Sequence, residues 1–196
     1  GAKFATKIPL IERFAKRADG MVITGAILNN FYKTSGFEVG VSVVEAGFDA
    51  PIKRILKEPA LLLPTDVVVL RGGKGIACPI DEVTPKDKIV DIGPMSISHI
   101  VEKIAKAKLV VWNGPTGWYE GGFTKGTIAL AKAIANARAK AVIGGGDTAA
   151  VLEKIFKKTG TPRQVFLSTG GGATLEYLAK GTLVGIEAFS KGKTKK

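Results

Sequence analysis

Three kinds of residue in this chain have the types and spacing for phosphate chemistry: glycines, lysines and one aspartate. Three glycines stand directly before Asp147 in AVIGGGDTAAVLEKIF, between an apolar run and a helix-like run. Glycines let the backbone approach a phosphate closely, and a helix N-terminus offers unpaired N–H groups and a partial positive charge. The stretch therefore predicts a loop that binds an anion. The alternative is a tight turn that Asp147 caps.

Asp147 is the candidate metal ligand of this loop. A carboxylate beside a phosphate repels it unless a cation lies between them, and Mg²⁺ commonly binds through one or two carboxylates plus phosphate oxygens. The alternative role for Asp147 is the N-cap of a helix over residues 147–158. Lys3 and Lys7 are four residues apart, so they would share one face at a helix start. They would either bind phosphate or form a solvated basic turn.

Two common nucleotide motifs are disfavoured. The chain has no Walker loop, because G-x-x-x-x-G-K-[ST] does not occur in it. The segment GGGDTA satisfies the loose pattern G-x-G-x-x-A, but no acidic residue ends the strand that follows about 20 positions on. A nicotinamide site is therefore not expected.

Four glycine-rich segments occupy the same place in the predicted order of elements. They are VITGA at 22–26, VVWNGP at 110–115, VIGGGDT at 142–148 and LSTGGGAT at 167–174. Each follows a strand and precedes a helix or loop. The carboxyl ends of parallel strands lie along one edge of a sheet, and ligands bind there. Because all four segments are expected at this edge, a ligand site explains their glycines better than tight turns alone.

Strands that are apolar throughout alternate with helices along the chain. This alternation predicts an α/β fold, namely a Rossmann-like parallel sheet with helices on both faces in three layers. Helices are predicted over 7–18, 26–35, 50–58, 96–107, 123–137, 147–158 and 174–180. Strands are predicted over 21–23, 60–64 with 66–70 (one interrupted strand or two), 88–94, 109–112, 141–143 and 165–168. Residues 71–83 are predicted to form a turn and a short strand, a small β excursion.

Composition favours anionic partners and excludes some classes of site. The 196 residues carry a net charge of +12, of which the lysines of the ending KGKTKK contribute +4. The rest of the chain is therefore basic too, which suits nucleic acid or phosphorylated small molecules. Cys78 is the one cysteine, so no internal disulfide is possible, and His99 is the one histidine, so histidine relays are disfavoured. No apolar run approaches the roughly 18 residues of a membrane span.

The motifs GAKFATKI, WNGPTGWYE, GGGDTAA and STGGGATLEYL, in this order, resemble the C-terminal, nucleotide-binding domain of phosphoglycerate kinase. The likeness covers nearly the whole chain, including the ending LVGIEAF. It implies that residues 1–190 form this domain without its first, central strand, so that the chain reads as a fragment. Residues 191–196 would be a basic tail.

The resemblance implies a cytoplasmic glycolytic kinase. Such an enzyme transfers a phosphoryl group reversibly between 1,3-bisphosphoglycerate with ADP and 3-phosphoglycerate with ATP. The nucleotide would bind this chain together with Mg²⁺. A separate N-terminal domain, absent here, would bind 3-phosphoglycerate, and the full-length enzyme would be monomeric.

The resemblance also implies roles for matched residues. Lys3 and Lys7 would contact the phosphates, and Asp147 would hold Mg²⁺. The transferring phosphoryl group would face the backbone N–H groups of Gly170, Gly171 and Gly172. The other positions expected at the nucleotide are Gly1, Ala2, Gly25, Ala26, Val90, Asn113, Pro115, Glu120, Gly145, Gly146 and Thr148.

Within that set the expected roles differ. Gly25, Ala26 and Val90 would border the adenine, and Glu120 would bind the ribose hydroxyls. The family usually has three glycines where this chain has Thr24-Gly25-Ala26, so the added side chains would narrow the adenine pocket. Trp118 and Tyr119 replace residues that are often smaller or apolar, and either could repack this edge.

Two other functions remain open from the sequence. One is a stand-alone nucleotide-binding module without turnover, which differs from a kinase half by what precedes Gly1 in the natural gene. The other is nucleic-acid binding, suggested by the charge. The chain shows no interleaving of aromatic and basic residues and no known reading motif, so neither nucleic acid nor a membrane is an expected partner.

Overall fold

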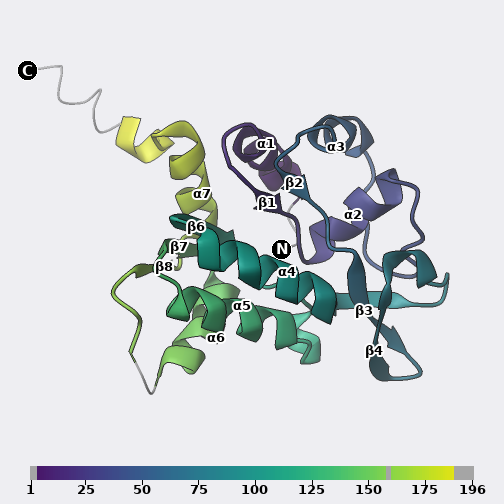
Figure 1. Cartoon of the computed structure of the whole chain (residues 1–196). Coiled ribbons are helices and arrows are strands. Elements are labelled where there is room, and N and C mark those ends of the chain that lie inside the picture. The colour runs from purple at the N-terminus through teal and green to yellow at the C-terminus, as the bar shows by residue number, and fades with distance from the viewer. Residues whose placement is uncertain (1–3, 158–159, 188–196) are drawn as a thin grey trace, which may run out of the picture.

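A computed structural model of the chain describes residues 4–157 and 160–187 (Figure 1). The strands of these residues form three sheets, and helices separate most of the strands along the chain. The α/β class predicted from the sequence is confirmed, with a parallel sheet of three strands at its centre.

The larger parallel sheet is formed by strands from the carboxyl-terminal half of the described chain. Its strands, in spatial order, are β6 (Leu109–Asn113), β7 (Lys140–Gly144) and β8 (Val165–Ser168). The register pairs Asn113 with Gly144 and Gly144 with Ser168, so the strands end level with one another. The loops that follow them therefore start from one edge, as expected for parallel strands.

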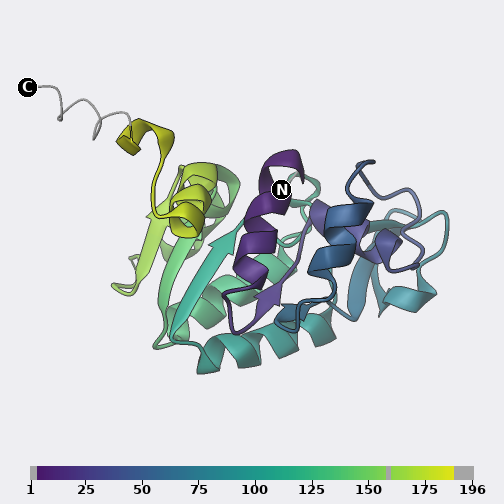
Figure 2. The same ribbon diagram turned by 90° about the horizontal axis from the view of Figure 1, so that it is seen from above.

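Helices cover both faces of this sheet. They include α4 (Pro94–Lys106), α5 (Lys125–Asn136), α6 (Gly146–Phe156) and α7 (Gly171–Lys180). Figure 2 shows α7 on one side of the sheet and α4 and α5 on the other. Apolar side chains of α4, α5 and α6 form one core with β7, in which Ile143, Leu152 and Ala131 are fully buried. Their burial supplies the main favourable free energy for this layer.

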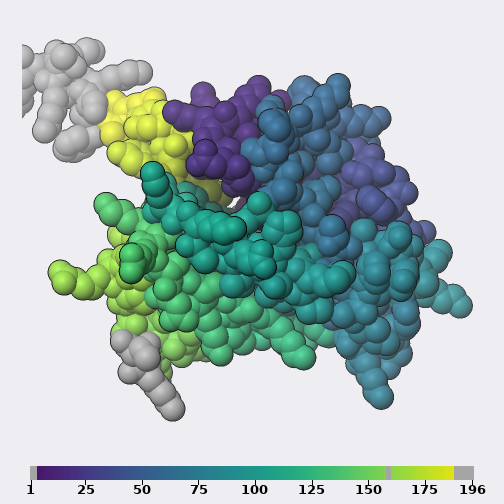
Figure 3. Space-filling view, viewed as in Figure 1, coloured from purple at the N-terminus to yellow at the C-terminus, as the bar shows by residue number. Residues whose placement is uncertain are grey.

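The amino-terminal half has its own core. It contains α1 (Phe4–Ala15), α2 (Ala26–Thr34), α3 (Asp49–Ile55) and a parallel pair, β1 (Met21–Val22) with β2 (Leu61–Leu62). Phe31, Ile52 and Ile55 are fully buried there. Figure 3 shows α1 against α7, where Arg17 donates a hydrogen bond to the carbonyl oxygen of Ala179 at 3.4 Å.

The parallel strands do not form one continuous sheet in the described part of the chain. There β1 pairs only with β2, and β6 pairs only with β7, so each has one open edge. The sequence predicted a single sheet from the apolar strands, but the resemblance also implied that a central strand is lacking. The expectation of a single sheet is therefore wrong for the described residues, and the expectation of a missing strand stays a prediction.

The segment predicted as a β excursion, residues 71–83, supplies the middle strand in sequence of a third, antiparallel sheet. This sheet consists of β3 (Asp66–Arg71) between β4 (Lys74–Pro79) and β5 (Lys88–Ile92). The sequence analysis was wrong to count residues 66–70 and 88–94 with the parallel sheet. Both strands are apolar because both are largely buried, and such a pattern does not distinguish parallel from antiparallel pairing.

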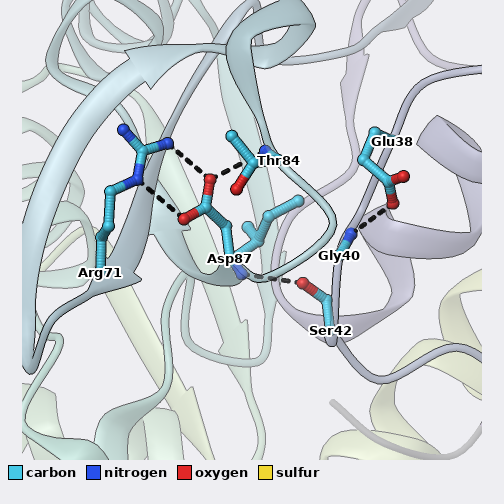
Figure 4. Close-up of polar contacts among 7 residues, drawn as sticks. Glu38, Gly40, Ser42, Arg71, Thr84 and Asp87 are labelled. Atoms are coloured by element: carbon cyan, nitrogen blue, oxygen red, sulfur yellow. Dashed lines mark hydrogen bonds and ion pairs between the residues drawn. The ribbon is translucent and has the colours of Figure 1, made fainter.

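An ion pair between the exposed Arg71 and the buried Asp87 joins this sheet to the turn that contacts the loop before α3 (Figure 4). Arg71 donates to both carboxylate oxygens of Asp87, and the N–H of Thr84 donates to the same carboxylate at 2.8 Å. The carbonyl oxygen of Asp87 accepts from Val41 at 2.8 Å. Gly40 has φ +56°, and a Cβ there would collide with the Asp87 carbonyl, so this position requires glycine.

The one cysteine, the one histidine and the lengths of the helices complete the description of the fold. Cys78 is buried, and its burial raises the pKa of the thiol, as suits a small core residue. His99 is exposed on α4. Among the described helices, none has the length and apolar character to cross a bilayer.

Candidate functional site

Consecutive contacts connect the glycine-rich loops at the carboxyl edge of the strands. The N–H of Gly25 donates to the carbonyl oxygen of Thr116 at 3.1 Å, which links the loop after β1 to the loop after β6. The N–H of Gly145 donates to the carbonyl oxygen of Ser168 at 3.1 Å, which links the loops after β7 and β8. A Cβ on Gly171 would collide with the backbone of Gly145, so this approach requires glycine. The four predicted segments therefore lie on one edge.

The first helix brings a cation to this edge. Lys7 of α1 is close enough to Asp147 of α6 for the two charges to interact. Burial lowers the pKa of Lys7, and the attraction of Asp147 offsets part of that lowering. A partly desolvated lysine beside the N-terminus of α6 is placed to neutralise an anion. Lys3, Gly1 and Ala2 lie outside the described residues.

Two buried polar side-chain atoms at this edge have no hydrogen-bond partner among the described residues. They are Nδ2 of Asn113, at the end of β6, and Oγ1 of Thr148, in the first turn of α6. Both face Gly145, because a Cβ there would lie 3.8 Å from Asn113 Nδ2 and 3.5 Å from Thr148 Oγ1. A buried donor without a partner costs free energy, so such groups are expected to meet a ligand or water.

Asp147 is not the N-cap of its helix. The N-cap of α6 is Gly145, with φ 112° and no side-chain cap bond, and Asp147 lies in the first turn with its side chain exposed. The N-cap role considered for Asp147 is therefore wrong, because Gly145 occupies that position. No cluster of three or more potential metal ligands occurs within 4–157 and 160–187. One exposed carboxylate would fit a Mg²⁺ only if phosphate and water supplied its other ligands.

The helix after the fourth glycine-rich segment begins earlier than predicted. The sequence predicted a helix over 174–180, whereas α7 begins at Gly171 with Gly170 as N-cap. Gly171 is buried against Gly145, while a Cβ on Gly172 would meet open space. The first turn of α7 therefore lies directly beside the loop of Gly145 and Gly146, with its N-terminal amides at the edge.

The expected adenine residues have different surroundings. Gly25 has φ 72° and precedes α2, so glycine is required there, whereas Thr24 and Ala26 do not adopt a left-handed conformation. The departure from three glycines is therefore compatible with the backbone. Val90 is 3 % exposed, and its carbonyl oxygen accepts from the N–H of Trp118 at 2.7 Å. Its side chain is part of the interior.

Trp118 and Tyr119 occupy the outer part of the loop after β6. Trp118 stacks on Phe123 with ring centroids 6.2 Å apart, and the ammonium group of Lys88 lies 3.6 Å from the Trp118 ring centroid. Lys154 of α6 donates to the Tyr119 hydroxyl at 3.2 Å. These contacts hold η2 (Tyr119–Gly121), which carries the exposed Glu120, against α6 and β5.

Three residues that fix the loop after β6 by hydrogen bonds were not predicted from the sequence. Asp91, Thr116 and Thr127 are all buried. The hydroxyl of Thr116 donates to Asp91, and the N–H of Thr116 donates to the hydroxyl of Thr127. All three lie outside the four glycine-rich segments, although Thr116 directly follows one of them. Their contacts span 11 and 25 residues of sequence, so no local pattern marks them.

Comparison with known proteins identifies the family. The family model for phosphoglycerate kinase matches residues 1–181. The chain belongs to the phosphoglycerate kinase family. Similar proteins include the phosphoglycerate kinases of Solibacter usitatus, 40 % identical over 97 % of this chain and 49 % of the relative, and of Prosthecochloris aestuarii, 38 % identical over 97 % and 50 %.

Solved phosphoglycerate kinase structures agree with this assignment. The enzyme from Coxiella burnetii superposes with a TM-score of 0.80 at 33 % identity, covering 92 % of this chain and 48 % of that one. The enzyme from Pyrococcus horikoshii gives a TM-score of 0.78 at 28 % identity, covering 96 % and 49 %. The chain therefore spans about half the length of the phosphoglycerate kinases that it matches.

Proposed function

We propose that this chain is the nucleotide-binding, C-terminal half of a phosphoglycerate kinase. It binds ADP or ATP with Mg²⁺ at the edge formed by residues 4–7, 24–26, 113–120, 145–148 and 170–172. Lys3, outside the described residues, is expected to contact the phosphates as well. The observation that carries the proposal is the pair of buried, unpartnered atoms, Asn113 Nδ2 and Thr148 Oγ1, on an edge of close-packed glycine backbone. A bound phosphate chain would supply the oxygen acceptors that both groups lack.

The residues of this edge supply what phosphoryl transfer requires. Such reactions depend on positioning and on neutralising the charge of the transferring group, with little covalent help from the protein. Lys7, with Lys3, contacts the phosphates, and the first-turn amides of α6 and α7 donate toward them. The backbone N–H groups of Gly170, Gly171 and Gly172 face the transferring phosphoryl group.

Asp147 is the proposed protein ligand of the metal. Its carboxylate is exposed at the start of α6, beside the proposed phosphate positions. When bound, Mg²⁺ neutralises charge on the phosphate oxygens. In the free protein the charge of Asp147 already attracts that of Lys7, and bound nucleotide with its metal would give both groups further partners.

The remaining positions carry the nucleoside. Gly25 and Ala26, at the start of α2, border the base from the side of β1, and Val90 supports it from the interior. Glu120 binds the ribose hydroxyls from η2. Asn113 and Pro115 lie by the phosphates.

The complete reaction needs a second substrate, which we assign to the other half of the enzyme. The chain covers about half of each kinase that it matches, so 3-phosphoglycerate would bind to the half that these residues do not match. Transfer then requires the two halves to meet, since holding both reactants together supplies much of the rate enhancement of such reactions. The proposed setting is glycolysis in the cytoplasm.

Substitution of Thr148 by valine tests the proposal. In the free protein this removes a buried hydroxyl that has no partner, so the free energy of unfolding should stay constant or rise. Affinity for MgADP should nevertheless fall, by about tenfold if one charge-assisted hydrogen bond is lost. Calorimetric titration and thermal unfolding of the same variant give both values.

Thr127→Val is the matched control. Thr127 and Thr148 are both 0 % exposed, but Oγ1 of Thr127 accepts from the N–H of Thr116 at 3.0 Å. Its loss should therefore lower stability, by about 1 kcal/mol or more. If Thr148→Val destabilises the chain as much as Thr127→Val does and leaves MgADP affinity unchanged, the hydroxyl is structural and the proposal is wrong.

A further inference from the structure

Asp91 is a buried carboxylate that none of the proposed nucleotide contacts uses. It lies in β5 and is 4 % exposed. Its Oδ1 accepts from Thr116 Oγ1 at 2.8 Å and from the N–H of Ile92 at 2.9 Å, and its Oδ2 accepts from the N–H of Gly126 at 3.0 Å. One carboxylate therefore joins β5, the loop after β6 and the first turn of α5.

Thr116 extends this connection to the proposed nucleotide edge. Its carbonyl oxygen accepts from the N–H of Gly25 at 3.1 Å, and its own N–H donates to Thr127 Oγ1 at 3.0 Å. Because the Thr116 hydroxyl gives its proton to Asp91, the hydroxyl of Thr127, 3.1 Å away, is the donor to Thr116. Every polar atom of the Thr116 backbone and side chain is therefore engaged.

The packing around Asp91 leaves little freedom. A Cβ on Gly117 would lie 2.6 Å from Asp91 Cγ, and one on Gly126 would lie 2.8 Å from Asp91 Oδ1. Both glycines thus allow backbone to close around the carboxylate. Burial raises the pKa of Asp91, while the hydrogen bonds from Gly126, Thr116 and Ile92 act in the opposite direction. Burying a carboxylate is costly, and its main effect here is to fix geometry.

We propose that Asp91 is the positioning residue of the nucleotide edge. Through Thr116 it holds the Asn113–Pro115 turn and the Gly25 turn at a fixed separation, so that the base and phosphate contacts are preorganised. This inference rests on the nucleotide-binding role proposed above. Asp91 itself does not touch the nucleotide.

Asp91→Asn is the test, with Asp66→Asn as a matched control. Asparagine keeps the size of Asp91 but turns an N–H toward one of the present donors. Asp66 lies in the neighbouring strand β3, is 3 % exposed and also accepts three hydrogen bonds. Its donors are Ser96 Oγ and the N–H groups of Met95 and Ser96, at the start of α4, and none of these residues is among the proposed nucleotide contacts.

Both substitutions should lower the unfolding temperature, whereas only Asp91→Asn should weaken ADP binding. We expect the Kd for ADP to rise about tenfold in Asp91→Asn and less than about twofold in Asp66→Asn, measured by calorimetry where circular dichroism shows both folded. Hydrogen exchange on the free proteins gives a readout that needs no nucleotide. Asp91→Asn should accelerate exchange at the amides of Gly25, Thr116 and Gly126, and Asp66→Asn at Met95 and Ser96.

Equal changes of Kd in the two variants, or unaltered exchange at Gly25 and Thr116 in Asp91→Asn, would overturn the positioning role. Absence of ADP binding by the unaltered chain would instead refute the proposed function, and the exchange pattern would still decide whether Asp91 fixes the two turns. If Asp91→Asn does not fold, Thr116→Val removes the same connection from the loop side and should give the same pattern.

Discussion

Lys7 and Asp147 interact electrostatically at the start of α6, although 140 residues of sequence separate them. The first helix of the chain therefore places a cation near the loop after β7. Burial lowers the pKa of Lys7, and the attraction of the carboxylate acts in the opposite direction.

Lys7→Met should weaken binding of ADP while leaving binding of adenosine unchanged. The ammonium group contacts phosphate in the proposed complex, so its loss should raise the Kd for ADP about tenfold. The pKa of Lys7 is lowered in the folded chain, so its charged form costs stability at pH values below that pKa, and methionine removes this cost. The melting temperature near neutral pH should therefore not fall. Lys33→Met, on the exposed end of α2, is the control.

Asp147→Ala should reduce nucleotide affinity mainly when Mg²⁺ is present. Asp147 is not the N-cap of α6, so its contribution to stability is limited to the helix dipole and to Lys7, about 0.3–1 kcal/mol. Calorimetric titrations with ADP, in Mg²⁺ and in a chelator, separate the two effects. An equal loss of affinity under both conditions would rule out the metal-ligand role.

Gly171→Ala should destabilise the chain, and Gly172→Ala should not. A methyl group at residue 171 would collide with the backbone of Gly145, whereas at 172 it would meet open space. Overpacking of this kind costs about 1–3 kcal/mol, while alanine in a helix is favoured over glycine by up to about 1 kcal/mol. Denaturant unfolding of the two variants measures this difference. Equal stabilities would mean that the loops after β7 and β8 are not in close contact.

The ion pair of Asp87 with Arg71 should make the chain sensitive to acid. The hydrogen bonds from Arg71 hold the pKa of Asp87 well below its usual value in the folded state. Its contribution is therefore fully present above the unfolded-state pKa of about 3.9, and is lost as the pH falls from there through the lower folded-state pKa. Asp87→Asn should lower stability at pH 7 and flatten the dependence below pH 4. If the stability of Asp87→Asn falls in acid as steeply as that of the unaltered chain, Asp87 is not the source of the acid sensitivity.

Most elements were predictable from the sequence because local periodicity defines them. Helix α2 and strand β8 agree with their predicted positions to within one residue, since glycine or polar residues stand at their ends. Helix α7 begins three residues earlier than predicted because Gly171 packs on Gly145, a contact between distant segments. The pairing of β3 with β5 was also missed, because apolar strands do not show their direction.

The candidate site was predictable to the extent that its residues lie in glycine-rich segments. Asp147 was found in this way, whereas Asn113 and Thr148 were named from the family resemblance. The structure brings the segments of all three together. Asp91 was not found, because its role depends on Thr116 and Gly126, which the fold alone brings into contact with it. The unpartnered state of Asn113 Nδ2 likewise depends on which groups the packing leaves nearby.

The most direct test of a nucleotide site on this edge is calorimetric titration of the 196-residue chain with ADP in the presence of Mg²⁺. We predict saturable binding of one nucleotide, weakened when Mg²⁺ is removed and abolished or strongly reduced by combining Lys7→Met with Thr148→Val. No heat of binding at millimolar ADP, from a chain shown by circular dichroism to be folded, would contradict the proposed function.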